Sequence, residues 1–395
     1  MEISILCKVV DNFGDIGVSY RLSKNLKLFY PGHNINLIVS DLAAFKNINS
    51  LIDPSKNYQR IEELDVYDWN ASEYCSKVFS ENDGEKLSII IECFQCGRPE
   101  WMESILFEQK LQRTVNIIML DYLTAEKYAE DFHCLQSLTR SAKVQKVNFM
   151  PGFTAKTGGL IIGKDWENVP SYNKNGSVLI FTYNFDFLPV IQAAYKNNKK
   201  LLVAQGAGKK SFMSSLENFY SNYESLNCGE IQENFCRELP FLNQTEWDKM
   251  MKDCSALIIR GEESLSRACL SGIPFVWQAY PQSEKYHLVK MNALLDVMKE
   301  FFDKDLFTII KDLWLDFNSY NNSGRDESTI ANNASNADSN SSSLENNIFI
   351  HSNLFFENLE RLSEGFLNFA LALRKNGDLC HNLMTFIEKK YIINK

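Results

Sequence analysis

Long apolar runs are scarce in this chain, and their scarcity argues against a membrane-spanning protein. No segment reaches the roughly 20 consecutive apolar residues that a membrane-spanning helix needs. Met1 and Glu2 lead directly into a short apolar strand, without the basic region and apolar core of a secretion signal. We therefore expect no membrane association and a cytoplasmic location.

Histidine and clustered cysteine are also scarce. The five histidines are dispersed and suggest no Ser-His-Asp arrangement. The ten cysteines are scattered, and many lie in apolar runs, as is typical of reduced core residues and not of a disulfide framework. Cys93 and Cys96 have CxxC spacing, but a second pair and a nearby histidine cluster are missing. Neither a zinc site nor a redox site is expected there.

Positive charge is in deficit, while apolar residues are plentiful. The net charge of −9 argues against nonspecific nucleic-acid binding and is compatible with a basic protein partner. An apolar content of 45% is ample for hydrophobic cores. Since 395 residues exceed a typical single domain, two domains are predicted.

Alternating strands and helices predict an α/β protein with two Rossmann-like domains in tandem around a cleft. Strands are predicted at residues 3–10, 36–39, 87–92, 113–120 and 144–149, and again at 177–182, 201–204, 256–260 and 275–277. Helices are predicted among others at 188–196, 245–252 and 264–271. Residues 164–176, rich in Asp, Asn, Pro, Ser and Gly, have the composition of a linker. The domains are therefore expected at 1–170 and 177–358.

The C-terminal quarter contains two further segments. Residues 318–347 are dominated by Asn and Ser, so they cannot bury enough apolar surface and are expected to form a mobile insertion. Apolar residues then return at helical spacing. The helices at about 360–395 are expected to pack back on the first domain.

The turn after the first predicted strand is the most informative segment. It carries Gly14 and two carboxylates, Asp11 and Asp15, and opens the helix predicted at 18–30. Such turns hold ligands at the carboxyl ends of strands in open α/β sheets. Two carboxylates carry too much negative charge for a site that binds only phosphate. The turn is therefore predicted to bind a cation or to transfer a proton. The structural alternative for Asp15 is a helix N-cap.

A second informative segment runs from residue 254 to 282 as strand, charged turn, helix, strand and aromatic turn. Ser264 lies at or just inside the helix start, where free N–H groups bind phosphates. Arg260 would supply a full positive charge, and Tyr280 could donate its hydroxyl to the same anion. In the alternative, Glu262 and Glu263 cap the helix and one of them pairs with Arg260.

Residues 206–211, GAGKKS, resemble a phosphate-binding loop only superficially. The glycines are too close together and the serine is displaced from the lysine. A plain loop between a strand and a helix is expected.

Seven segments in consistent order resemble the family of elongation factor P arginine rhamnosyltransferases, EarP. They are VVDNFGDIG (9–17), IECFQCGRPEW (91–101), LDYLTAEKY (120–128), FMPGFTAKTGGLI (149–161), LPFLNQTEWDKMM (239–251), RGEESLSRA (260–268) and GIPFVWQAYPQ (272–282). The resemblance implies a GT-B fold and metal-independent, inverting transfer of rhamnose from dTDP-β-L-rhamnose to an arginine of elongation factor P. The modified factor would then relieve ribosomes stalled on consecutive prolines.

The resemblance also implies roles for individual residues. Asp11 and Asp15 match the family's catalytic aspartates; we expect Asp15 to be the general base and Asp11 to orient the acceptor, with the reverse assignment as the alternative. The family's donor site matches, in this chain, Gly14, Phe181, Trp247, Arg260, Glu262, Glu263, Ser264 and Tyr280. Phe181 and Trp247 are the candidates for stacking on thymine, with core packing as the alternative. Relatives tend to carry phenylalanine where Trp247 stands.

Two other functions are compatible with the residues. A sugar-nucleotide glycosyltransferase with a hydroxyl acceptor would use the same fold and donor loop, although it needs one base only. A non-catalytic cleft protein that binds a nucleotide-like ligand is the other. Donor hydrolysis or transfer would separate this second alternative from an enzyme.

Overall fold

The computed structural model describes residues 1–10, 14–109, 111–222, 235–319 and 338–392, which divide into two compact units. Unit 1 comprises Met1–Glu167 and Leu373–Lys395, and unit 2 comprises Asn168–Ala372. In this described part of the chain, no helix combines the length and the apolarity that crossing a membrane requires.

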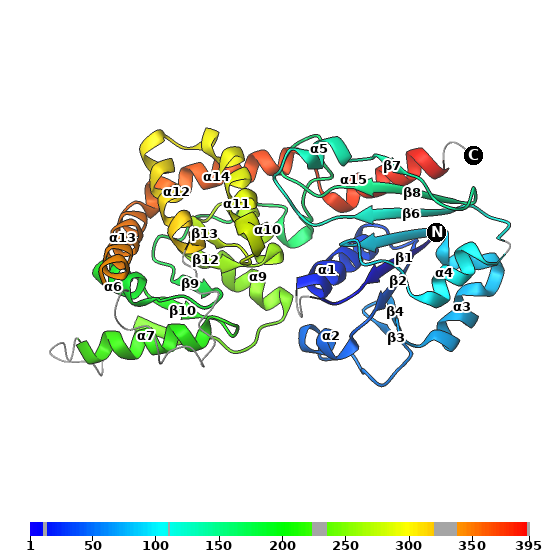
Figure 1. Cartoon of the computed structure of the whole chain (residues 1–395), viewed down its shortest axis with the longest axis horizontal. Helices are drawn as coiled ribbons and strands as arrows, with labels where there is room; N and C mark the ends of the chain where they lie inside the picture. Colours follow the sequence, from blue (N-terminus) through cyan, green and yellow to red (C-terminus); the bar gives the residue numbers. More distant parts are fainter. Residues whose placement is uncertain (11–13, 110, 223–234, 320–337, 393–395) are drawn as a thin grey trace. The chain divides into compact units, whose positions relative to one another are not determined.

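An eight-stranded sheet forms the centre of unit 1, with the order β3-β4-β2-β1-β5-β6-β8-β7 (Figure 1). Only β3 and β7, at its two edges, run antiparallel to their neighbours β4 and β8. The strands are β1 (Glu2–Cys7), β2 (Asn34–Val39), β3 (Tyr58–Ile61), β4 (Leu64–Asp68), β5 (Ile89–Cys93), β6 (Val115–Leu120), β7 (Gln136–Ser137) and β8 (Val144–Phe149). The central strands β1 and β5 are almost fully buried because helices cover both faces of the sheet.

Two hydrophobic cores lie on the two faces of this sheet. Successive side chains of a strand point to opposite faces, so Ile5 of β1 belongs to one core and Leu6 to the other. The core around Ile5 is closed by α1 (Gly14–Phe29), α2 (Leu42–Ile48) and α15 (Leu379–Ile387), and the core around Leu6 by α3 (Ser72–Gly84) and α4 (Glu100–Phe107). The remaining elements of unit 1 are η1 (Glu85–Leu87), α5 (Tyr128–Phe132), η2 (Lys164–Trp166) and η5 (Glu388–Ile392).

Unit 2 is built on a five-stranded parallel sheet with the order β11-β10-β9-β12-β13. Its strands are β9 (Val178–Phe181), β10 (Leu201–Val203), β11 (Cys236–Glu238), β12 (Ala256–Arg260) and β13 (Phe275–Gln278). Its helical elements are α6 (Leu188–Lys196), α7 (Lys209–Asn222), α9 (Gln244–Lys252), α10 (Glu262–Ser271), η3 (Ser283–Lys285), α11 (Tyr286–Met298), η4 (Lys299–Phe301), α12 (Lys304–Ser319), α13 (Asp338–Glu357) and α14 (Leu359–Lys375). Because all the strands are parallel, their carboxyl ends share one edge, where an open α/β sheet binds ligands.

The predicted α/β class and the nine predicted strands are confirmed, with shifts of a few residues at their ends. The β3–β4 hairpin was not predicted. Its β3 sequence, YQRI, is largely polar, and its turn consists of Glu62 and Glu63, both at positive φ, instead of the usual glycine or asparagine. Sequence patterns alone therefore gave no indication of this edge.

The predicted borders of the insertion, residues 318 and 347, are wrong. Asn318 is buried in the last turn of α12, and α13 begins at Asp338, so both borders are helical. Residues 320–337 lie outside the described residues. The C-terminal segment joins unit 1 at Leu373 and not near residue 360, because Phe366 of α14 packs on Phe275 within unit 2.

Candidate functional site

Arg260 lies at the carboxyl end of β12, where aromatic rings surround its guanidinium group. The guanidinium carbon is 4.8 Å from the ring centre of Phe181 and 4.6 Å from that of Tyr183. Among the described residues, no carboxylate forms an ion pair with Arg260, and its Nε atom is buried without a hydrogen-bond partner. The alternative of an ion pair with a neighbouring glutamate is therefore wrong. These contacts hold a positive charge at the carboxyl edge of the sheet.

Further aromatic side chains extend this group. Trp247 of α9 contacts Phe181 edge to face at 4.9 Å between ring centres, and Tyr280 contacts Tyr183 in the same way at 5.4 Å. The structure thus brings together four of the residues matched to the family's donor site, Phe181, Trp247, Arg260 and Tyr280. Tyr183, which joins them, was missed. Its position two residues after Phe181, just beyond the end of β9, was the available signal.

The helix that follows Arg260 begins earlier than expected. Gly261, at φ 74°, is the N-cap residue, and α10 starts at Glu262. Ser264 is therefore the third helical residue, buried at 6% exposure, and not the N-cap. Glycine at 261 allows the left-handed turn that aims the first N–H groups of α10 at the sheet edge. Anions are stabilised at such a helix start, although Glu262 and Glu263 in its first turn reduce the positive potential.

Hydrogen bonds from α12 and α11 support the loop that carries Tyr280. The side chain of Asn318 accepts the N–H of Ala279 and donates to the carbonyl of Trp277, each at 2.8 Å. His287 accepts the Gln282 N–H at Nδ1, so its Nε2 carries the proton and donates to the Asn318 carbonyl at 3.0 Å. This loop is thus anchored on both sides of Tyr280.

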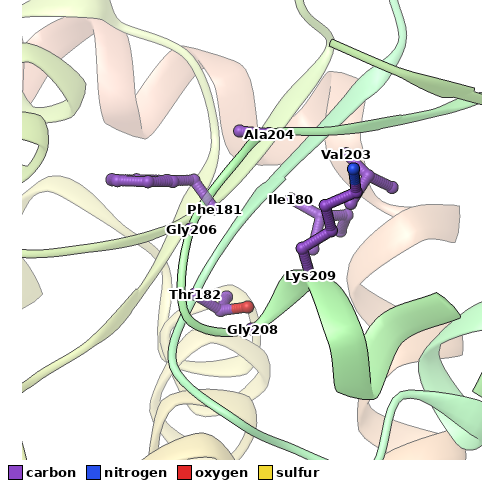
Figure 2. A pocket seen from close by; sticks show the side chains of 8 residues that line it. All are labelled: Ile180, Phe181, Thr182, Val203, Ala204, Gly206, Gly208 and Lys209. Carbon is purple, nitrogen blue, oxygen red and sulfur yellow. The ribbon is translucent and has the colours of Figure 1, made fainter. Parts of the chain in front are cut away.

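The glycine-rich loop at residues 206–211 lies beside the same group. It connects β10 to α7, as expected, and the Lys209 ammonium pairs with Glu238. A small pocket there is lined by Phe181, Thr182, Gly206, Gly208 and Lys209, among others (Figure 2). A Cβ atom on Gly208 would lie 2.6 Å from the Thr182 hydroxyl, so only glycine allows this close contact between loop and strand.

Of the two carboxylates predicted at the turn after β1, the structure describes Asp15. It is the second residue of α1, is only 3% exposed, and accepts the Val10 N–H at 2.8 Å through Oδ2. It therefore lies inside the helix and binds the turn before it, which argues against the N-cap alternative. Asp11 lies outside the described residues. Gly14, matched to the donor site, is the first residue of α1, and its role stays a prediction.

Two buried thiols lie near Asp15. Burial raises the pKa of the Cys7 thiol and of the Cys93 thiol, and the negative charge of Asp15 adds to both rises. Asp15 thus lies close to the ends of β1 and β5. In the described residues, no group of three or more His, Cys, Asp or Glu side chains is placed to hold a metal ion.

Comparison with known proteins gives one consistent family. The family model described as "Elongation-Factor P (EF-P) rhamnosyltransferase EarP" matches residues 3–388. The protein-arginine rhamnosyltransferase of Shewanella oneidensis is 28% identical over 347 residues, which cover 80% of this chain and 84% of the relative. The enzyme of that name from Neisseria meningitidis is 30% identical over 320 residues, 75% of this chain and 79% of the relative.

Solved structures support the fold. A structure described as the structural basis for EarP-mediated arginine glycosylation of translation elongation factor EF-P aligns over 99% of this chain and 100% of its own, with a TM-score of 0.55 and 16% identity. A UGT transferase from Siraitia grosvenorii in complex with UDP aligns over 98% and 99%, with a TM-score of 0.50 and 9% identity. The chain therefore belongs to the EarP family of elongation factor P rhamnosyltransferases and is a glycosyltransferase of the GT-B type.

Proposed function

We propose that this chain transfers L-rhamnose from dTDP-β-L-rhamnose to an arginine side chain of translation elongation factor P, with inversion at the anomeric carbon and without a metal ion. Membership of the EarP family and relatives named protein-arginine rhamnosyltransferases support the sugar and the acceptor residue. Acting on a translation factor, the enzyme would work in the cytoplasm.

The observation that carries the donor half of this proposal is the environment of Arg260. A guanidinium stacked on Phe181 and Tyr183, with no carboxylate partner among the described residues, is free to form two parallel hydrogen bonds to a diphosphate. Tyr280 would add its hydroxyl and the first N–H groups of α10, from Glu262 to Ser264, would complete the anion site. Such preorganised positive charge stabilises the leaving dTDP as it departs.

Thymine recognition falls to Phe181 and Trp247. Their rings meet edge to face at 4.9 Å, so a base that stacks on one ring contacts the edge of the other. Gly14, at the start of α1, would approach the donor through its backbone. The side chains of Glu262 and Glu263 would turn to sugar hydroxyls.

The acceptor half rests on Asp15 and Asp11. A guanidinium is a poor nucleophile because it stays protonated and its lone pairs are delocalised. One carboxylate would orient it by paired hydrogen bonds while the other accepts a proton. As the guanidinium nitrogen forms its bond to the anomeric carbon, the bond from that carbon to the phosphate oxygen breaks, its electron pair leaves with dTDP, and Asp15 takes the nitrogen's proton.

Intact-mass spectrometry of elongation factor P incubated with this protein and dTDP-L-rhamnose tests the proposal. We expect a mass gain of one deoxyhexose, lost when the acceptor arginine is changed to lysine or when the enzyme carries Asp15→Asn. Asp15→Asn should retain dTDP binding, because the side chains proposed to bind the diphosphate and the thymine belong to unit 2. Transfer at the wild-type rate by Asp15→Asn would remove Asp15 as the base. The absence of any gain with folded, dTDP-binding protein would instead point to a GT-B enzyme with another acceptor.

A further inference from the structure

A tight turn at the end of β5 contains two consecutive residues in the left-handed conformation, and neither is glycine. Phe94 has φ 57° and Gln95 has φ 52°. The Cys96 N–H closes the turn by donating to the Cys93 carbonyl at 3.1 Å. This conformation is disfavoured for phenylalanine and glutamine, and such residues cluster where a protein uses them. The side chains of Phe94 and Gln95 are therefore expected to have a function.

Buried polar contacts fix this turn in place. Glu92, at 3% exposure, accepts the Gly97 N–H at 3.1 Å and pairs with Arg98 at 2.6 Å. The Phe94 N–H donates to the carbonyl of Leu120, the last residue of β6, at 2.7 Å. The turn is thus held from its own strand and from the neighbouring strand.

The turn presents an aromatic surface with a negative charge beside it. The Phe94 ring stacks on Tyr122 at 4.7 Å between centres, with 24° between the ring planes, and Tyr122 remains 37% exposed. Asp121 accepts the Gln95 amide at 2.9 Å and the Tyr122 N–H at 2.8 Å. Within the described residues, no cationic side chain forms an ion pair with Asp121. The carboxylate is therefore oriented but not neutralised.

The sheet places this surface next to the turn that carries Asp15. β1, β5 and β6 are consecutive parallel strands, with Leu6 opposite Glu92 and Cys93 opposite Leu120. The chain leaves all three strands at the same edge. Asp15 lies near Cys93, whose pKa is raised by burial and further by the Asp15 charge. The aromatic surface and Asp15 thus share one edge of unit 1.

We propose that Phe94, Tyr122 and Asp121 bind the acceptor protein at the chain segment next to the arginine that is modified. The inference rests on the proposed function, in which Asp15 acts on that arginine. Aromatic faces beside an unneutralised carboxylate attract basic and planar side chains, whereas the carboxylate would repel a nucleotide diphosphate. Exposed tyrosines of this kind carry much of the binding energy in protein interfaces.

Steady-state transfer with varied elongation factor P tests this inference. Tyr122→Ala is expected to raise the acceptor KM about tenfold, the loss typical of an interface aromatic, with kcat and dTDP affinity unchanged. Tyr122→Phe keeps the stacking ring and should restore most of the lost affinity. Asp121→Asn should raise KM as well, and by a larger factor at low than at high ionic strength. Tyr74→Ala is the matched control, because Tyr74 on α3 is equally exposed at 37%.

The outcomes separate this inference from the proposed function. If Tyr122→Ala and Tyr74→Ala give the same KM, the proposed surface is wrong while the transfer reaction stands. A loss of dTDP affinity in Tyr122→Ala equal to its loss of transfer would overturn the inference too. If the wild-type enzyme leaves elongation factor P unmodified, the proposed function fails and this inference falls with it.

Discussion

Replacing Arg260 by lysine separates the charge of this residue from its planar shape. Lysine keeps the positive charge at the end of β12, but it cannot stack flat on Phe181 and Tyr183 or form two parallel hydrogen bonds to a diphosphate. Alanine removes the charge as well. Comparing the two variants therefore shows which property binds the donor.

The structure sets the expected loss in dTDP affinity. The two ring contacts, at 4.8 and 4.6 Å, lie within the range of cation–π interactions, each worth about 0.5–1 kcal/mol at a partly exposed site. Losing one of two charge-assisted hydrogen bonds costs about 1.5 kcal/mol more. Arg260→Lys should therefore weaken dTDP binding by about 2.5–3.5 kcal/mol, which is roughly 60- to 300-fold. Arg260→Ala should weaken it further.

Isothermal titration calorimetry with dTDP measures this loss. Arg361→Lys provides the control, because Arg361 lies exposed on α14 and donates to the neighbouring Asn358 side chain. Circular dichroism would establish that each variant is folded. A dissociation constant for Arg260→Lys within threefold of the wild-type value would refute the assignment of Arg260 as a stacked, bidentate ligand of the diphosphate.

Three further predictions concern the support of this site and the stability of unit 2. Gly208→Ala would place a Cβ atom 2.6 Å from the Thr182 hydroxyl. This variant should lower the free energy of unfolding, measured by urea titration, by about 1–3 kcal/mol and weaken dTDP binding. The control is Gly32→Ala, which has no atom within 4 Å of the added Cβ and should leave the free energy of unfolding nearly unchanged. Asn318→Ala leaves the buried Ala279 N–H without a partner and should cost about 2–4 kcal/mol in the same titration, a loss below 0.5 kcal/mol contradicting the role of Asn318 in holding the loop. Burial raises the pKa of Asp316 above its ordinary value of 3.8, an effect larger than the opposing one of its histidine partner. The Asp316 carboxyl therefore stabilises the fold most at a pH below its ordinary pKa, and this contribution is lost as the pH rises through its raised pKa. Asp316→Asn should accordingly gain stability relative to wild type between about pH 4 and pH 7. The prediction is contradicted if the free energies of unfolding of Asp316→Asn and wild type differ by the same amount at pH 4 and at pH 7.

Much of the fold was predictable because several of its strands are short apolar runs bounded by turn residues. The run at residues 256–260 matches β12 over its full length, and the helix expected at 188–196 matches α6. The β3–β4 hairpin escaped prediction, since its polar strand and its Glu62–Glu63 turn carry no local signal. The start of α10 was placed too late, because the serine at 264 suggested a cap while Gly261 supplies it.

The sequence by itself determined which residues reach the carboxyl edge of the sheet in unit 2. Phe181 and Arg260 end strands, and the carboxyl ends of parallel strands meet at one edge whatever the details of packing. Only the tertiary structure decided what Arg260 contacts there. An arginine beside two glutamates can form an ion pair or stack on rings, and local sequence does not distinguish the two. β12 pairs with β9, which brings Arg260 to Phe181 and Tyr183, residues almost 80 positions earlier in the chain. The choice was settled by strand pairing between distant segments, which no local pattern encodes.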